Sequence, residues 1–281
     1  MSEPARPDSS PRSAAPLRIE WGRWLSASWP FVVPPLIAAL LAGIGWELYI
    51  EITNESKFVL PRPTAAIDAL FSDLDRFAAE GARTLWVSLA GLGVGASVAL
   101  FFAILMAHSV TLERALLPIA IMVKVTPIVA LAPLFVIWFG FGWEPKVAIA
   151  ALLAYFPVLI NAIVGLRDVD PRTLDFLRSV DASKREVFWT LRMPSALPFL
   201  FAALKISATL SLIGAVVAEF FSAQQGGLGA VISLEQRNLE LDEVFAAIIA
   251  LTVIGVLLNT AIVVTERLTL SWHRSTMTAA G

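Results

Sequence analysis

Residues 147–166 read VAIAALLAYFPVLINAIVGL, a stretch without a single charged side chain. A helix of about 20 residues crosses the ~30 Å hydrocarbon core of a bilayer, so this stretch predicts a membrane-spanning helix. Five further apolar runs lie at approximately 29–50, 85–107, 115–139, 199–221 and 244–266. Because the runs are continuous and do not alternate with a period of two, they predict helices rather than barrel strands. The predicted fold is all-α, a polytopic membrane protein with six transmembrane helices.

The composition excludes several classes of function. Apolar residues make up 57% of the chain and charged residues only 16%, against about 25% charged residues in soluble domains. The formal net charge of −2 offers no basic surface for nucleic acid. The absence of cysteine excludes disulfides, thiolate metal sites and cysteine nucleophiles. With only His108 and His273 as imidazoles, we expect neither a metal site nor enzymatic activity.

The distribution of Lys and Arg predicts the orientation in the membrane, because cytoplasmic loops retain these residues. With the N-terminus inside, thirteen cations fall in inner segments: Arg6, Arg12, Arg18, Arg23, Arg114, Arg167, Arg172, Arg178, Lys184, Arg185, Arg192, Arg267 and Arg274. Six fall in outer segments: Lys57, Arg62, Arg76, Arg83, Lys146 and Arg237. Both termini are therefore expected in the cytoplasm.

The segments outside the spans predict the domain organisation. Residues 1–28 are rich in Ser, Pro, Arg and Ala and are expected to form a disordered tail. A single transmembrane domain is expected over 29–270, followed by a short tail over 271–281. Apolar residues recur with helical spacing over about 65–80, which predicts an external amphipathic helix that lies on the outer surface or against the bundle.

The apolar run at 115–139 contains Pro118, Pro127 and Pro133. Each proline removes an internal hydrogen bond and favours a kink. Bent helices often line a cavity, so this run is interpreted as lining a pathway, with irregular packing as the alternative.

The inner loop from Arg167 to Pro198 is too long for a simple connection and predicts two short helices. Asp170 is a good N-cap, and Pro171, the next residue, suits the first position of the helix. After a break at 181–182, Ser183 and Glu186 have the spacing of a capping box and predict a second helix that ends at 193–194. The apolar face of this pair requires either a partner protein or the inner ends of this chain's own spans.

This loop carries a resemblance to a known family. Asp175-Phe176-Leu177, then Asp181, then residues 191–194 (LRMP) have the spacing of the EAA motif in permease subunits of bacterial ABC importers. The surrounding sequence is similar to the nitrate, sulfonate, taurine and pyrimidine-precursor branch over about 55–270. The stretches that carry this similarity are PLFVIWFGFG at 133–142, ASKREVFW at 182–189, IGAVVAEF at 213–220 and GGLG at 226–229.

The resemblance implies a type I ABC importer permease fold in a bacterial inner membrane. It implies a homodimer or a paired permease, two cytoplasmic ATPase subunits and a periplasmic or lipid-anchored substrate-binding protein, with alternating access driven by the ATPases. The chain lacks the phosphate-loop pattern G-x-x-x-x-G-K-[ST], so it needs no cofactor of its own and ATP is expected on the partner ATPase. The implied ATPase-coupling residues are Asp175, Phe176, Leu177, Asp181, Ala182, Ser183, Glu186, Val187 and Phe188.

The chain departs from the family pattern at two places. It has Asp175-Phe176-Leu177 where the family usually has Glu-Ala-Ala, and Asp181 where the family usually has Gly. Gly suits a left-handed turn, and Asp is one of the few other residues that tolerates it. We therefore expect Asp181 in a tight turn and the coupling role to be kept.

Polar residues inside the spans are candidates for the translocation pathway. They are Lys124, Asn161, Lys205 and Glu219. Lys205 has a simpler interpretation, because a long side chain near a span end snorkels to the interface, and Asn161 also suits an interhelical hydrogen bond. Glu219 has the alternative role of fixing the loop 222–229.

Two other classes of protein also fit the hydropathy. A six-span channel or secondary transporter leaves the capped helical pair unexplained, and neighbouring genes for an ATPase and a binding protein would distinguish it from an importer permease. An intramembrane enzyme is disfavoured, because no nucleophile with a base can be assembled within a span.

Overall fold

The computed structural model describes residues 21–53, 55–56, 58–222, 224 and 226–270, and every regular element in these ranges is a helix. The chain divides into two compact units, residues 1–53 and 54–281, where the sequence predicted one transmembrane domain. In the first unit, α1 (Trp21–Thr53) begins inside the region expected to be a disordered tail, so residues 21–28 are helical. Residues 1–20 and 271–281 lie outside the described residues.

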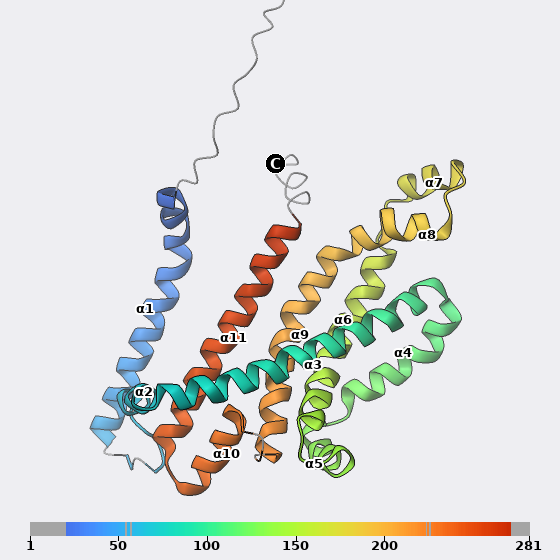
Figure 1. The fold of residues 1–281 in the computed structure, drawn as a ribbon. Coiled ribbons are helices and arrows are strands. Elements are labelled where there is room, and N and C mark those ends of the chain that lie inside the picture. Colours follow the sequence, from blue (N-terminus) through green and yellow to red (C-terminus); the bar gives the residue numbers. More distant parts are fainter. Residues whose placement is uncertain (1–20, 54, 57, 223, 225, 271–281) are drawn as a thin grey trace, which may run out of the picture. The chain divides into compact units, whose positions relative to one another are not determined.

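The second unit contains all the other helices (Figure 1). They are α2 (Pro63–Ser72), α3 (Leu74–His108), α4 (Val110–Val125), α5 (Ile128–Phe139), α6 (Glu144–Arg167), α7 (Pro171–Ser179), α8 (Lys184–Val187), a π-helical turn (Phe188–Arg192), α9 (Met193–Phe221), α10 (Leu228–Asn238) and α11 (Leu241–Thr269). In Figure 1, α7 and α8 lie at one end of α6 and α9, while α5 and α10 lie near the opposite end.

Among the described residues, five helices are long and apolar enough to span a membrane, and the number rises to six if α4 and α5 count as one broken span. The run over 115–139, in which the prolines predicted a kink, is broken into two helices, because α4 and α5 meet at 96°. The break falls at Pro127, whose missing N–H and extended conformation (ψ 97°) stop the helix. Pro118 and Pro133 lie within α4 and α5 and do not break them.

The outer amphipathic helix is also shorter than predicted. α2 ends at Ser72 and α3 starts at Leu74, so the second half of the expected helix is the first part of a 35-residue span. Phe77, which the sequence placed on the apolar stripe of this helix, packs within the bundle and is buried against Leu228 and Ala247.

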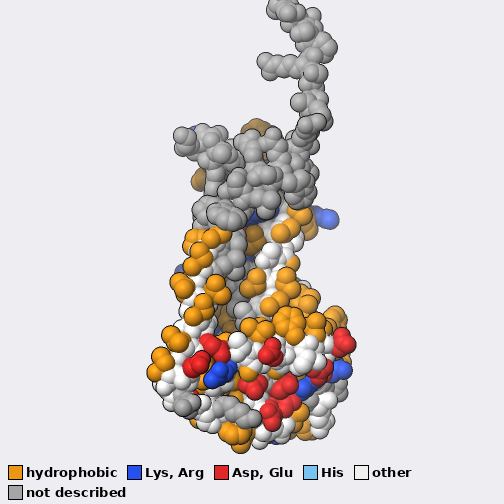
Figure 2. Space-filling model, turned by 90° about the vertical axis from the view of Figure 1, so that its left-hand side faces the viewer, with side chains coloured by type: hydrophobic (Ala, Val, Ile, Leu, Met, Phe, Trp, Pro, Cys, Tyr) orange, Lys and Arg blue, Asp and Glu red, His pale blue; other side chains and the backbone are white. Residues whose placement is uncertain are grey.

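The core of the second unit is formed by α3, α6 and α9, which pack closely because small residues face one another. A Cβ atom on Gly91 would overlap the Cβ of Ala150, so α3 approaches α6 at a distance that only glycine permits. The buried residues around this contact are mostly alanines, among them Ala99, Ala154 and Ala203. Figure 2 shows many exposed hydrophobic side chains on the visible surface, as expected for a protein that meets lipid.

Candidate functional site

The inner loop forms the predicted helical pair, and α7 starts at the predicted cap. The Asp170 side chain accepts hydrogen bonds from the backbone N–H groups of Arg172 and Thr173, at 3.3 and 3.1 Å, and Pro171 is the first helical residue. Hydrogen bonds from the Thr173 hydroxyl and amide hold the pKa of the Asp170 carboxyl below its ordinary value. The carboxylate therefore stays ionised and caps the helix.

The turn between α7 and α8 explains why the family prefers glycine at this position. Asp181 has a φ of 54°, the left-handed conformation expected of it. The N–H of Ala182 donates to the carbonyl of Leu177 at 3.0 Å, and the N–H of Asp181 donates to the carbonyl of Arg178 at 3.1 Å. These two bonds form a Schellman motif, whose left-handed residue is usually glycine.

The predicted capping box is confirmed at the start of α8. The Glu186 N–H donates to Ser183 Oγ at 3.3 Å, and Glu186 Oε2 accepts from the Ser183 N–H at 2.7 Å. This reciprocal pair fixes the direction in which the chain leaves the turn.

The second coupling helix does not end at Met193-Pro194, as the sequence predicted. α8 continues through the π-helical turn directly into α9, in which Pro194 occupies the first turn. The N–H of Met193 donates to the carbonyl of Phe188, five residues back, so the wider turn takes up the irregularity just before the proline. The loop and the span are therefore one continuous helical path, Lys184–Phe221.

The apolar side chains of the pair divide between two faces. Phe176 and Val180 on the α7 side are 64% and 58% exposed. Val187 is buried, and Phe188 packs on the chain's own core with its ring 5.9 Å from that of His108. Of the two coverings considered for this apolar face, the chain's own bundle covers Val187 fully and Phe188 in part, because the continuous helix turns both side chains toward the bundle.

Sequence reasoning missed Trp189, which is exposed and packs edge-on against Phe188. Among the other predicted coupling residues, Asp175 is exposed and pairs with Arg178 at 3.3 Å, while Leu177 and Ala182 are half-buried. The nine predicted coupling residues thus lie on α7, α8 and the residues that adjoin them. Phe176 is the exposed phenylalanine of this set.

The four predicted pathway residues do not form one cluster. Lys124 Nζ lies 4.5 Å from the centre of the Phe156 ring, a cation–π contact between α4 and α6. Asn161 donates to the carbonyl of Pro157 at 2.8 Å within α6, rather than across helices. Lys205 on α9 forms an ion pair with Glu266 on α11 at 2.6 Å, so it has a protein partner in place of the snorkelling interpretation.

Glu219, the fourth predicted pathway residue, is fully buried near the opposite end of α9. Its Oε2 accepts hydrogen bonds from Thr84 Oγ1 at 2.9 Å and from the N–H of Gly229 at 3.0 Å. Thr84 in turn accepts from the N–H of Leu228 at 2.8 Å. Of the two roles considered for Glu219, these contacts favour fixing the loop that precedes α10.

The same loop is held from α6 by Lys146, a residue that the sequence analysis counted only as a loop cation. Lys146 is 2% exposed, and its Nζ donates to the carbonyl of Gly226 at 2.9 Å. Electrostatic attraction links its ammonium group with the Glu219 carboxylate. Only one feature of the sequence could have indicated that Lys146 is buried. It stands three residues after Trp143, at the start of an apolar run.

Glycine is required where this loop crosses Glu219. Gly227 has a φ of 105°, and a Cβ there would overlap the Glu219 carboxylate. Its N–H donates to Glu80 Oε2 at 2.5 Å. We call Glu80, Thr84, Lys146, Glu219 and residues 226–229 the outer latch; it joins α3, α6 and α9 to the start of α10.

Comparison with known proteins identifies the family. Residues 91–268 match the family described as binding-protein-dependent transport system inner membrane component. The chain is 30% identical to the formylaminopyrimidine transport permease protein ThiX of Halalkalibacterium halodurans, over 85% of this chain and 96% of that protein. It is 31% identical to the putative aliphatic sulfonates transport permease protein SsuC of Bacillus subtilis, over 85% and 87%. It is 29% identical to the taurine transport system permease protein TauC of Escherichia coli, over 91% and 94%.

The match covers more than half of the chain, the aligned relatives are covered over most of their length, and the helical pair carries the spacing of the EAA motif. The protein therefore belongs to the family of binding-protein-dependent transport system inner membrane components, as a membrane-embedded permease subunit of an ABC importer.

Proposed function

We propose that two copies of this chain form the translocation pathway, that two cytoplasmic ATPase subunits bind ATP and dock on the α7–α8 pairs, and that an external binding protein delivers the solute. In this arrangement the chain lies in the bacterial inner membrane with both termini in the cytoplasm. The thirteen-to-six excess of inner Lys and Arg supports the orientation.

The observation that carries the proposal is the rigid connection between the loop and the bundle. α7 and α8 are capped at both N-termini and joined by a Schellman motif, and α8 runs without interruption into α9. A displacement of the pair by a closing ATPase dimer is therefore transmitted directly to the core helix α9. Phe176, exposed at the outer edge of α7, is the aromatic anchor for the ATPase surface.

The solute proposed for this pathway is a small molecule of the sulfonate, nitrate, taurine or pyrimidine-precursor type. The names of the relatives support this range. Lys124 supports an anion in particular, because it has no carboxylate partner among the described residues, whereas Lys205 is neutralised by Glu266. The ammonium group beside the break between α4 and α5 is then available to a passing anion.

Co-purification of the cognate ATPase with the permease tests the docking surface. Truncating a buried interface aromatic typically costs about 2 kcal/mol or more, so Phe176→Ala should lower the retained ATPase by at least about tenfold. Phe71→Ala is the matched control, because Phe71 on α2 is similarly exposed but lies outside the loop. Equal retention in both variants would place the docking surface elsewhere.

Labelling of single cysteines in this cysteine-free chain tests the orientation. In intact cells an impermeant thiol reagent should modify Ser72→Cys on α2 and leave Ser179→Cys on α7 unmodified until the cells are opened. The reverse pattern would refute the proposed orientation.

A further inference from the structure

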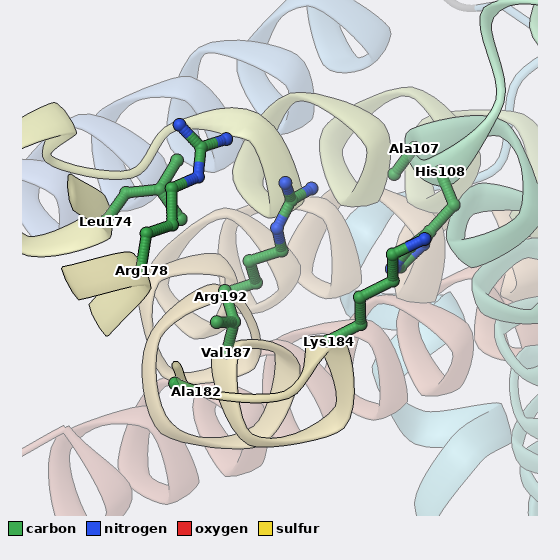
Figure 3. A pocket seen from close by; sticks show the side chains of 8 residues that line it. All are labelled: Ala107, His108, Leu174, Arg178, Ala182, Lys184, Val187 and Arg192. Atoms are coloured by element: carbon green, nitrogen blue, oxygen red, sulfur yellow. The ribbon is translucent and has the colours of Figure 1, made fainter. Parts of the chain in front are cut away.

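A pocket lies between the inner end of α3 and the coupling pair. Its volume is about 320 Å³, and eight residues line it: Ala107, His108, Leu174, Arg178, Ala182, Lys184, Val187 and Arg192. Figure 3 shows the basic side chains of this set reaching in from α3, α7, α8 and the π-helical turn. The pocket therefore lies between the C-terminal end of α3 and the segment that runs from α7 through α8 to the π-helical turn.

The lining is basic, and no acidic residue is part of it. Lys184 and Arg192 have no hydrogen-bond or ion-pair partner among the residues that the structure describes. Arg178 has only the exposed Asp175 at 3.3 Å. His108 Nδ1 lies 2.8 Å from the carbonyl of Ile104, which fits a proton on Nδ1 and leaves Nε2 for the pocket.

Three permanent cations and an imidazole around one cavity repel one another, and a bound anion relieves this repulsion. Guanidinium and ammonium groups together suit an anion with several oxygens, since Arg binds two oxygens at once and Lys binds as a point charge. The volume holds about ten water molecules at ~30 Å³ each, which leaves room for a phosphate group and part of the molecule that bears it.

We propose that this basic pocket binds a phosphate group, supplied either by the headgroup of an anionic phospholipid or by a soluble phosphate. The anion contacts α7 through Arg178, α8 through Lys184 and the π-helical turn through Arg192, and a hydroxyl of the phosphate or of its headgroup donates to Nε2 of His108 on α3. It thereby ties the coupling pair to the end of the span that precedes α4. A bound anion restrains the movement of the α7–α8 pair relative to α3. It therefore affects how readily the pair moves with a docked ATPase.

Thermal unfolding of the full chain tests the site, with each probe at constant ionic strength. The probes are inorganic phosphate in an uncharged detergent, and nanodiscs with or without phosphatidylglycerol in a phosphatidylcholine background. At about five times Kd a bound anion shifts the folding equilibrium sixfold, which raises the midpoint by about 2–4 °C for a chain of this size. The test variant is Lys184→Gln/Arg192→Gln.

The matched control is Arg172→Gln/Arg185→Gln, which removes the same charge from α7 and α8 at positions that do not line the pocket. Stabilisation that is lost in the test variant and kept in the control supports the proposal. A shift with inorganic phosphate assigns a soluble ligand, and a shift with phosphatidylglycerol alone assigns a lipid headgroup. No shift with either probe, or equal shifts in the two double variants, would overturn the proposal.

A third measurement separates this site from the ATPase contact. If purified ATPase protects Lys184 from an amine reagent while phosphate and phosphatidylglycerol do not, the pocket receives carboxylates of the ATPase and the proposal is refuted. The docking role of Phe176 does not depend on this result, because the unfolding measurements use the permease alone.

Discussion

Removing the Glu219 carboxylate is the sharpest test of the outer latch. Glu219→Met deletes the acceptor of two hydrogen bonds, from Thr84 and from the backbone of Gly229, and leaves the Lys146 ammonium buried without its attracting charge. Hydrogen bonds to a charged group contribute about 1.5–3 kcal/mol each, so losing two of them costs about 3 kcal/mol or more. We expect Glu219→Met to lower the free energy of unfolding by about 3–5 kcal/mol.

A double-mutant cycle with Lys146→Met isolates the attraction between the two charges. Each single variant leaves one buried charge behind, whereas Glu219→Met/Lys146→Met leaves none. The double variant should therefore lose less than the sum of the single losses, with a coupling energy of about 1.5–3 kcal/mol. The free energies come from unfolding the purified chain with a denaturing detergent.

Glu243→Met is the control for this cycle. Glu243 pairs with Arg76 at 3.3 Å and is partly exposed, so its loss should cost no more than about 1 kcal/mol. If Glu219→Met costs as little as this control, or if the losses of the two single variants simply add, the latch does not hold the loop and the argument from its hydrogen bonds fails.

Three further predictions concern the pathway, the core and the turn. Lys124→Leu should leave assembly intact and reduce uptake of an anionic solute at least about tenfold, as measured with the labelled solute; unchanged uptake would remove Lys124 from the pathway. Gly91→Ala should destabilise the chain by about 1–3 kcal/mol because the added methyl overlaps α6, whereas Gly93→Ala, with nothing near its Cβ, should stabilise it by up to about 1 kcal/mol; the same unfolding assay compares them, and equal effects would contradict the close contact. Asp181→Gly should keep ATPase co-purification and raise the unfolding free energy by about 0.5–1 kcal/mol, because the left-handed φ then carries no Cβ penalty; a loss of stability would show that the Asp181 side chain has a role of its own.

Local signals in the sequence predicted the local features of the coupling pair. Asp170 and the Ser183–Glu186 box act over three residues, so their hydrogen bonds follow from spacing alone. The end of the second helix was predicted wrongly because Met193-Pro194 looked like a stop. A proline is tolerated in the first turn of a helix, and the π-helical turn before it keeps α8 and α9 continuous.

Contacts between segments far apart in the chain could not be predicted from the sequence. Lys146 and Glu219 lie 73 positions apart, and only the packing of α6 against α9 brings them to the same loop. Lys205 was recognised as a charge within a span, yet nothing in one sequence indicates that α9 and α11 place it 2.6 Å from Glu266. Spacing along the chain predicts caps and turns, whereas pairing across helices depends on their relative rotation and depth.

The three fixed points along α9 suggest how one helix serves both ends of the permease. Its N-terminal end continues into α8, its middle is tied to α11 by Lys205 and Glu266, and its C-terminal end is bound to the latch by Glu219. Because these attachments are a covalent continuation, an ion pair and hydrogen bonds to a buried carboxylate, bending α9 independently of the bundle would break the ion pair or expose the carboxylate. A push on the coupling pair is therefore relieved most readily by moving α9 together with α6, α11 and the outer loop as one body, which is the motion that alternating access requires.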